Sequence, residues 1–273
     1  MSETIGFIGL GHLGLPMATH LLNMGYGLRV YNRTASKAES LVAQGAEQVP
    51  RPADVAASGG VVASIVWDDA SLESIVMSDG FLDKLGQGGV HLSMTTILPA
   101  TARKLAEIHA QHGSSYVAAP IFGRPEAAVA KQLWIPFAGE QKAKDRVRPL
   151  LEAMGGQGIF DFGDDVGAST LVKLVGNFLI MSAGASMREA LAMADSQGVD
   201  PKGVIDMLTQ TLFNAPIYRS YGARIAARNA PFDQTAIPLK DVGLFKTTAQ
   251  QVESPTPIAG LLLDLLKSGA TGA

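Results

Sequence analysis

The feature that most constrains the fold is a glycine-rich segment near the start of the chain. An apolar run at Ile5–Ile8 leads directly into Gly9-Leu-Gly-His-Leu-Gly14, which has the spacing G-x-G-x-x-G, and a helix-patterned segment follows at Leu13–Met24. A lone match to this spacing is weak evidence, but a match placed between a strand and a helix is typical of the first turn of a βαβ unit.

Short apolar runs alternate with helix-patterned segments up to about Phe162. The expected strands are Ile5–Ile8, Leu28–Tyr31, Val61–Val66, Val90–Met94, Tyr116–Ala119, Trp134–Ala138 and Ile159–Phe162. The expected helices between them include Leu13–Met24, Ser36–Gln44, Pro99–His112 and Gln141–Met154. This alternation predicts an α/β domain over residues 1–162, a Rossmann-type doubly wound parallel sheet with helices on both faces.

From residue 163 to 273 the pattern is helical throughout, which predicts a second, all-α domain. Its first helix, Val166–Ser196, is long and apolar on nearly every side, so we expect it to be buried between the domains or against a partner chain. The later helices are expected near Pro201–Leu212, Pro216–Arg228, Leu239–Val252 and Pro257–Lys267. Residues 268–273 are expected to form a frayed end.

Composition excludes several functions. With 47% hydrophobic residues, the 273-residue chain can bury a large core, so it is not a disordered segment. Its 22 Lys and Arg against 25 Asp and Glu leave no large basic surface, and nucleic acid is not an expected partner. Because the chain has no cysteine, it has no thiolate nucleophile, thiolate zinc site or iron–sulfur cluster. Redox chemistry would therefore need a bound cofactor.

Two segments bear on location. The N-terminal sequence lacks the basic and long apolar regions of a signal peptide, which favours a cytoplasmic protein. The most apolar long window, Leu171–Met187, contains Lys173, Asn177, Ser182 and Ser186. These polar residues favour a core helix over a membrane span.

The glycine loop predicts a site for a dinucleotide. Gly9 permits the tight turn, Gly11 leaves room for a diphosphate, and Gly14 allows the helix and strand to pack closely. The diphosphate would then face N–H groups at the helix N-terminus. The expected cofactor-binding residues of the loop are Gly9, Leu10, Gly11, His12, Leu13 and Gly14; of these, His12 is expected to contribute mainly through its backbone N–H.

The end of the second expected strand indicates which dinucleotide is bound. NAD-binding proteins usually carry Asp or Glu there, whereas this chain has Tyr31-Asn32-Arg33-Thr34. Arg33 can offer a planar fork of donors to a 2′-phosphate, and Asn32 and Thr34 add neutral donors. These residues favour NADP over NAD. The alternatives are a solvated Arg33 that begins the next helix, or a glycosylated Asn32, which a cytoplasmic location excludes.

Lys173 and Asn177 are candidates for proton transfer. They lie four residues apart on the long helix and so share one face. A desolvated lysine has a pKa below its ordinary value of about 10.4, which would make Lys173 a general acid toward a carbonyl. The alternative is structural, with Lys173 reaching solvent and Asn177 capping or bridging.

Several segments together resemble the β-hydroxyacid dehydrogenase family, which includes 3-hydroxyisobutyrate dehydrogenases and glyoxylate or succinic semialdehyde reductases. The matching segments, in order along nearly the whole chain, are FIGLGHLGLPMATHLL, YNRT, Thr95-Thr96-Ile97-Leu98-Pro99, G-x-x-x-x-x-K-x-x-x-N at Gly167 to Asn177, and Lys240-Asp241.

The resemblance implies a Rossmann domain joined to a helical domain, with the active site in the cleft between them. It also implies that Lys173 is catalytic and that Asn177 orients the substrate. Lys240 matches a lysine that reaches the cofactor, and Thr96 matches a threonine beside the nicotinamide. Val66, the last residue of the strand expected at Val61–Val66, and Trp67, which follows it, complete the expected cofactor site.

The chain departs from the family at the loop that receives the substrate. The family usually has D-A-P-V-S-G-G, whereas this chain has Ala118-Ala-Pro-Ile-Phe-Gly-Arg124. Phe122 replaces the serine and Arg124 replaces the second glycine. Arg124 either binds a substrate carboxylate or is a surface residue that ends the loop. The expected substrate-binding residues are Phe122, Gly123, Arg124 and Asn177. Trp67 stands where the family commonly has leucine or a similar residue, and this difference also leaves the identity of the substrate undetermined.

Other polar residues are expected to be structural. His109 and His112 have no third ligand at a useful spacing, so no metal site is expected, and they are assigned to a solvated helix face. The acidic pairs Asp68-Asp69 and Asp164-Asp165 are expected to cap helices.

The sequence therefore predicts an NADP-dependent oxidoreductase, an enzyme that transfers hydride between nicotinamide and a small aldehyde, ketoacid or 3-hydroxyacid. Lys173 would act as its general acid and base. The alternatives are an imine reductase or reductive aminase on the same scaffold and a non-catalytic NADP-binding module. We expect a homodimer, with a tetramer left open, because the helical layer is too thin to cover the long helix.

Overall fold

The computed structural model describes residues 3–227 and 236–268. The chain forms two compact units, Met1–Lys173 and Leu174–Ala273, and each is described by itself. The division lies within helix α8 (Val166–Ser196), whereas the sequence-based boundary was placed just before that helix, at residue 162.

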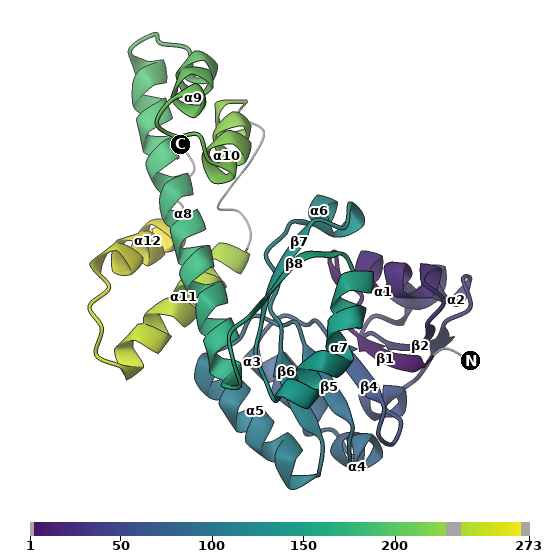
Figure 1. The fold of residues 1–273 in the computed structure, drawn as a ribbon. Helices are drawn as coiled ribbons and strands as arrows, with labels where there is room; N and C mark the ends of the chain where they lie inside the picture. The colour runs from purple at the N-terminus through teal and green to yellow at the C-terminus, as the bar shows by residue number, and fades with distance from the viewer. Residues whose placement is uncertain (1–2, 228–235, 269–273) are drawn as a thin grey trace. The chain divides into compact units, whose positions relative to one another are not determined.

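The first unit contains a parallel sheet of six strands in the order β3-β2-β1-β4-β5-β6 (Figure 1). The strands are β1 (Thr4–Ile8), β2 (Gly27–Tyr31), β3 (Glu47–Gln48), β4 (Val61–Ser64), β5 (Val90–Ser93) and β6 (Ser115–Ala118). Strands β2 and β4 pair with β1 on either side, where the strand order reverses. In doubly wound sheets ligands bind at this switch point, beyond the carboxyl ends of the strands.

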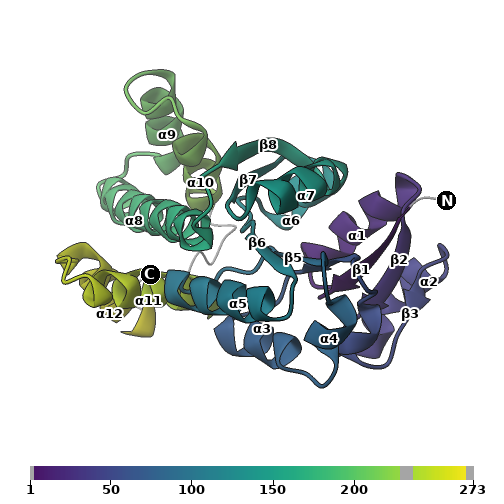
Figure 2. The same cartoon turned by 60° about the horizontal axis from the view of Figure 1, so that its bottom comes forward.

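Helices cover both faces of this sheet (Figure 2). They are α1 (Gly14–Asn23), α2 (Glu39–Val42), α3 (Asp69–Val76), α4 (Phe81–Leu85), α5 (Pro99–Gln111), α6 (Pro125–Val129) and α7 (Gln141–Ala153), with 3₁₀ turns η1 (Ala35–Ala38) and η2 (Pro52–Val55). Side chains alternate between two cores, since Ile5 and Phe7 join one cluster and Ile8 joins the other. The Rossmann-type fold predicted from the sequence is confirmed.

The last two expected strands do not extend this sheet. Strands β7 (Leu133–Phe137) and β8 (Gly156–Asp161) pair with each other in parallel as a separate two-stranded sheet. Isolated antiparallel bridges instead join Ala118, at the end of β6, to Ala138, just after β7, and Phe122 to Trp134 of β7.

The second unit is all-helical, as predicted. Besides the remainder of α8 it contains α9 (Pro201–Gln210), α10 (Pro216–Ala226), α11 (Ala236–Gln251) and α12 (Pro257–Ser268). Phe178 and Met181 of α8 pack on a cluster from α11 and α12, while Met187 and Leu191, further along, pack on α9 and α10. The expected frayed end beyond Ser268 lies outside the described residues.

Helix α8 is long and apolar enough to cross a membrane by length and composition, a property that it shares with core helices of soluble proteins. Several of its apolar side chains are exposed in the single chain, including Leu179 and Met193.

Candidate functional site

The three glycines of the loop after β1 are required for different reasons. A Cβ on Gly9, where φ is +98°, would overlap the carbonyl group of Ile65, and a Cβ on Gly14 would overlap the Gly9 carbonyl oxygen. A Cβ on Gly11, by contrast, would meet no atom of the chain within 4 Å. Gly9 and Gly14 are therefore needed for the turn itself, whereas Gly11 keeps a space open.

That space lies beside the N-terminus of α1. Leu13 precedes α1 and supplies no side-chain hydrogen bond to cap it, and His12 is exposed. An uncapped helix N-terminus with a bare glycine beside it has the shape and the polarity that a diphosphate needs. The residues present fit a dinucleotide cofactor.

The segment after β2 is tied to the glycine loop. The Asn32 Oδ1 accepts a hydrogen bond from the Leu10 N–H at 2.9 Å, and the Asn32 Nδ2 donates to the Thr34 carbonyl at 2.8 Å. Asn32 therefore holds the two loops together. Arg33 and Thr34 are exposed beside it, and of the segment Tyr31–Thr34 only Arg33 carries a charge.

The segment after β4 is held by a residue that the sequence-based site omitted. The Val66 N–H donates to the buried Thr95 Oγ1 at 3.0 Å. Thr95 thus fixes the backbone before Trp67, which is 47% exposed, while its neighbour Thr96 is half-buried. The sequence could have indicated Thr95, because Thr95-Thr96 belongs to one of the segments that resemble the family.

The substrate loop is fastened by backbone hydrogen bonds to Trp134 of β7 and to Ala138, the residue after β7. Ala118 exchanges two backbone hydrogen bonds with Ala138, both 3.0 Å, and Phe122 exchanges two with Trp134, at 2.8 and 3.0 Å. Arg124 is exposed, and its Nε lies 3.5 Å from a carboxylate oxygen of Glu126 in α6. The loop therefore has a fixed backbone and an exposed cation at its end.

Lys173 lies over this loop. Its Nζ is 4.2 Å from the centre of the Phe122 ring, and the side chain is buried. One turn earlier on α8, the buried Ser169 Oγ donates to the Ala118 carbonyl at 2.9 Å. The structure thus brings together the predicted residues Lys173 and Phe122, in the same unit as the glycine loop.

The start of α8 is held by charged residues. Arg103 of α5 pairs through Nε and Nη2 with both oxygens of Asp165, at 2.9 and 2.7 Å, and Asp165 also accepts from the Gly167 N–H. A Cβ on Gly167 would overlap the Arg103 guanidinium. The glycine in the motif at Gly167 to Asn177 therefore has a packing reason.

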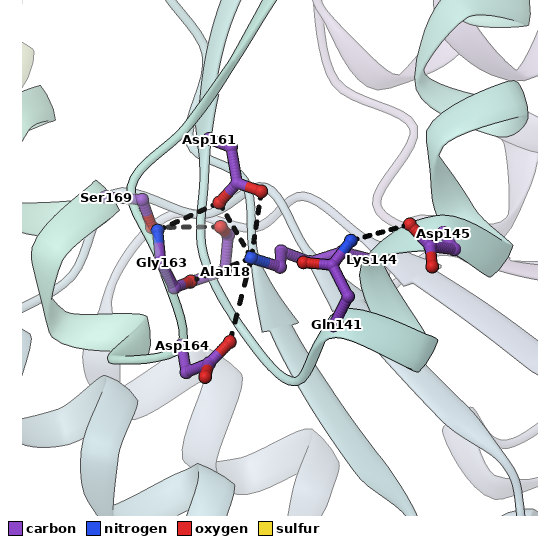
Figure 3. Close-up of polar contacts among 8 residues, drawn as sticks. All are labelled: Ala118, Gln141, Lys144, Asp145, Asp161, Gly163, Asp164 and Ser169. Atoms are coloured by element: carbon purple, nitrogen blue, oxygen red, sulfur yellow. Dashed lines mark hydrogen bonds and ion pairs between the residues drawn. The ribbon is translucent and has the colours of Figure 1, made fainter.

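Figure 3 shows a second anchor, centred on Lys144 of α7. Its Nζ lies 2.7 and 2.9 Å from the Asp161 carboxylate oxygens, 3.2 Å from the Gly163 carbonyl and 3.7 Å from Asp164 Oδ1. Burial raises the pKa of Asp161, but the Lys144 bond and the Gly163 N–H outweigh this effect and leave that pKa lowered. Lys144 therefore ties α7 to the segment that joins β8 to α8.

In the second unit, Asn177 is paired with Asp241. The Asn177 Nδ2 donates to Asp241 Oδ2 at 2.6 Å, and the Lys240 Nζ lies 3.0 Å from Asp241 Oδ1. Because a carboxylate only accepts hydrogen bonds, this contact fixes which end of the Asn177 amide faces Asp241. Asp241 is buried and orients both predicted residues; the Lys240-Asp241 pair in the sequence was its signal.

The assignment of His109 to a solvated face was wrong. His109 is fully buried, because it lies on the same stripe of α5 as Ala102 and Leu105, whereas His112 is exposed. The capping role expected of Asp68 is confirmed, since its Oδ1 accepts from the Ser71 N–H at 2.9 Å.

Comparison with known families gives matches over both units. The family described as the NAD-binding domain of 6-phosphogluconate dehydrogenase matches residues 4–163. The family described as the NAD-binding region of NADP-dependent 3-hydroxyisobutyrate dehydrogenase matches residues 167–273.

Two relatives match along nearly their whole length. An uncharacterized oxidoreductase of Bacillus subtilis, YfjR, is 36% identical over 269 residues, covering 97% of this chain and 93% of that protein. The NAD-dependent L-serine dehydrogenase of Pseudomonas aeruginosa is 31% identical over 282 residues, covering 97% of this chain and 91% of the relative.

Solved structures share the fold. The 3-hydroxyisobutyrate dehydrogenase of Mycobacterium tuberculosis with L-serine has a TM-score of 0.88 at 23% identity and covers 100% of this chain and 95% of its own. An imine reductase of Streptomyces aurantiacus has a TM-score of 0.69 at 24% identity and covers 98% and 94%. The two family matches and the relatives above 30% identity decide the assignment: the chain belongs to the β-hydroxyacid dehydrogenase family of NAD(P)-dependent oxidoreductases.

Proposed function

We propose that this protein is an NADP-dependent reductase that transfers hydride between the nicotinamide and a small aldehyde, ketoacid or 3-hydroxyacid, with Lys173 as its general acid and base. The observation that carries the proposal is the buried Lys173 side chain, whose Nζ lies 4.2 Å from the centre of the Phe122 ring on an anchored loop. It lies in the unit that holds the dinucleotide loop.

The chemistry divides between cofactor and protein. A reduced nicotinamide, when bound, supplies the hydride that the chain cannot provide. Lys173 Nζ donates the proton that the carbonyl oxygen needs as its carbon is reduced, and takes it back from the hydroxyl in the reverse direction. Asn177, held by Asp241, orients the substrate. Lys240, which pairs with the same carboxylate, would contact the cofactor.

The choice of NADP rests on Arg33. This side chain is exposed after β2, next to an asparagine that holds the glycine loop, and no carboxylate stands in the segment Tyr31–Thr34 to receive ribose hydroxyls. A guanidinium binds a 2′-phosphate through paired, charge-assisted hydrogen bonds.

The test is to replace Lys173 with alanine. We expect the kcat for carbonyl reduction to fall at least about a hundredfold, with the Kd for NADPH changed less than about threefold. Lys142→Ala is the matched control, since it removes an exposed lysine of α7. Activity of Lys173→Ala within a few-fold of the wild type would mean that Lys173 is not the proton donor.

An imine substrate is the second candidate, because Phe122 gives the substrate loop an apolar side chain where a hydroxyl would suit a polar substrate. NADPH oxidation measured with glyoxylate, succinic semialdehyde and a cyclic imine separates the two reactions. A protein that binds NADPH and reduces nothing in a broad carbonyl and imine panel would instead be a non-catalytic NADP-binding module.

We also propose that the protein is a cytoplasmic homodimer. Leu179 is 60% exposed and Met193 is 68% exposed on α8, and burial of such side chains against a second chain would stabilise the assembly. Light scattering at micromolar concentration should give twice the 28.5 kDa of one chain. A mass of 28.5 kDa would contradict a dimer, and four times that mass would indicate a tetramer.

A further inference from the structure

Phe122 has a backbone that cannot shift freely. Its N–H donates to the Trp134 carbonyl at 2.8 Å, and its carbonyl accepts from the Trp134 N–H at 3.0 Å. A reciprocal pair of this kind fixes both peptide groups of a residue, so the ring can move only about its own side-chain bonds. The backbone position from which the ring projects is therefore fixed by β7.

Lys173 is fixed to the same loop from the other side. Ser169 lies one turn before it on α8, and its hydroxyl donates to the Ala118 carbonyl at the start of the loop. Ala118 is itself paired with Ala138, the residue after β7. The helix that carries Lys173 and the loop that carries Phe122 thus share one anchor, and the Lys173 Nζ lies 4.2 Å from the ring centre.

The contact has a defined electrostatic consequence. The face of an aromatic ring carries partial negative charge, so it attracts an ammonium within about 6 Å and does not attract a neutral amine. The attraction is stronger where water is excluded, and Lys173 is buried. The ring thus stabilises the protonated form of Lys173 relative to the neutral form.

We infer that Phe122 is a positioning residue. Its ring face holds the Lys173 Nζ in place and in the protonated form that can donate a proton. This inference rests on the proposed role of Lys173. During reduction an N–H bond of the ammonium breaks as the O–H bond of the alcohol forms, and the electron pair of that N–H bond stays on nitrogen. The ring then favours reprotonation of the neutral amine from solvent.

Two substitutions separate the effect of the aromatic face from the effect of side-chain volume. Phe122→Leu keeps an apolar side chain but removes the aromatic face, and Phe122→Tyr keeps the face. If Phe122→Leu does not fold, Phe122→Met takes its place under the same criteria. Thermal unfolding of each variant shows whether it is folded before it is assayed.

The first measurement needs no cofactor and no turnover. In protein labelled with ¹³C at lysine Cε, the Lys173 signal is identified by its absence from Lys173→Arg. We expect a ring-current shift of this signal in the wild type and in Phe122→Tyr, and its loss in Phe122→Leu. The titration midpoint of Lys173 should fall by about 0.5–1.5 pH units in Phe122→Leu and return to within about 0.3 units in Phe122→Tyr.

The second measurement is the pH profile of kcat/KM at saturating NADPH. Its basic limb, which reports deprotonation of the essential acid, should move down by the same amount in Phe122→Leu and be rescued in Phe122→Tyr. An unchanged Lys173 midpoint in Phe122→Leu would overturn the inference while leaving the role of Lys173 intact. A different result would contradict the proposed function: near wild-type activity of Lys173→Ala would show that Lys173 is not the proton donor.

Discussion

The Nδ1 atom of His91 lies 3.1 Å from the Nε2 atom of His109 in the interior of the first unit. The His109 Nδ1 lies 2.7 Å from the Leu105 carbonyl oxygen and must donate to it, so the His109 Nε2 is the acceptor. The His91 Nδ1 must then carry a proton, and its Nε2 accepts from the Ser64 hydroxyl at 2.8 Å. The chain of contacts therefore specifies two neutral histidines, both protonated at Nδ1.

This arrangement predicts acid-sensitive stability. Burial lowers the pKa of His91 well below its ordinary value, with the neighbouring His109 adding to the effect, and burial also lowers the pKa of His109, to about 4. Between pH 6.5 and pH 4 the unfolded chain therefore binds protons that the folded chain excludes. The free energy of unfolding therefore has its full contribution from the neutral histidines above about pH 6.5. It falls by up to about 1.4 kcal/mol per pH unit for each histidine as the pH drops below that value.

Urea unfolding between pH 4.5 and pH 8 measures this slope. His109→Gln removes one titrating group. The free energy of unfolding should then depend on pH less steeply, by the equivalent of about one bound proton, even though the substitution also lowers stability at pH 7. His12→Gln is the control, because His12 is exposed in the glycine loop, away from the buried histidine pair. Long-range ¹⁵N–¹H spectra should show both Nδ1–H forms, and an Nε2–H form at either histidine would contradict the proton assignment.

Lys144 provides a second test of stability. Lys144→Met keeps the apolar stem but removes the bonds from Nζ to Asp161 and the Gly163 carbonyl. Because these are charge-assisted bonds made by a buried group, we expect the free energy of unfolding to fall by about 1–3 kcal/mol. Lys142→Met, an exposed site on the same helix, should change it by less than about 0.5 kcal/mol. Equal effects in urea unfolding would argue against an anchoring role.

Much of the fold follows from local patterns in the sequence. The span predicted for α8 matches the structure at both ends, and six of the seven expected strands begin within one residue of their observed positions, while the seventh begins three residues earlier. Strand β3 was missed because Glu47 and Gln48 are exposed and carry no apolar alternation. The separate β7–β8 sheet was missed because strand partners are chosen by tertiary packing, which periodicity does not report.

The site was less accessible to sequence reasoning, for a related reason. The contact of Asn177 with Asp241 spans 64 residues, and that of Ser169 with Ala118 spans 51. Such pairs depend on how elements pack. The burial of Lys144 did have a local signal, since it shares the apolar face of α7 with Val147 and Leu151.

Arg33 is tested by binding of two ligands that differ in one phosphate. In Arg33→Ala the Kd for NADPH should rise about 10- to 100-fold, since charge-assisted bonds to the 2′-phosphate are lost. The Kd for NADH should change less than about threefold, which makes NADH the internal control. Calorimetry measures both values, and an equal loss for the two ligands would assign Arg33 a structural role instead.

Gly11 allows binding to be separated from folding. A methyl group at Gly11 meets no atom of the chain within 4 Å, so Gly11→Ala should fold with unchanged or slightly greater stability. The methyl group would occupy space that the diphosphate needs, and the Kd for NADPH should rise at least about tenfold. Gly14→Ala should instead destabilise the fold, because its methyl group overlaps the Gly9 carbonyl oxygen. Gly203→Ala, on an exposed turn of α9, should alter neither property for the worse. Thermal unfolding and calorimetry on the three variants give the comparison, and tight NADPH binding by a folded Gly11→Ala would place the diphosphate elsewhere.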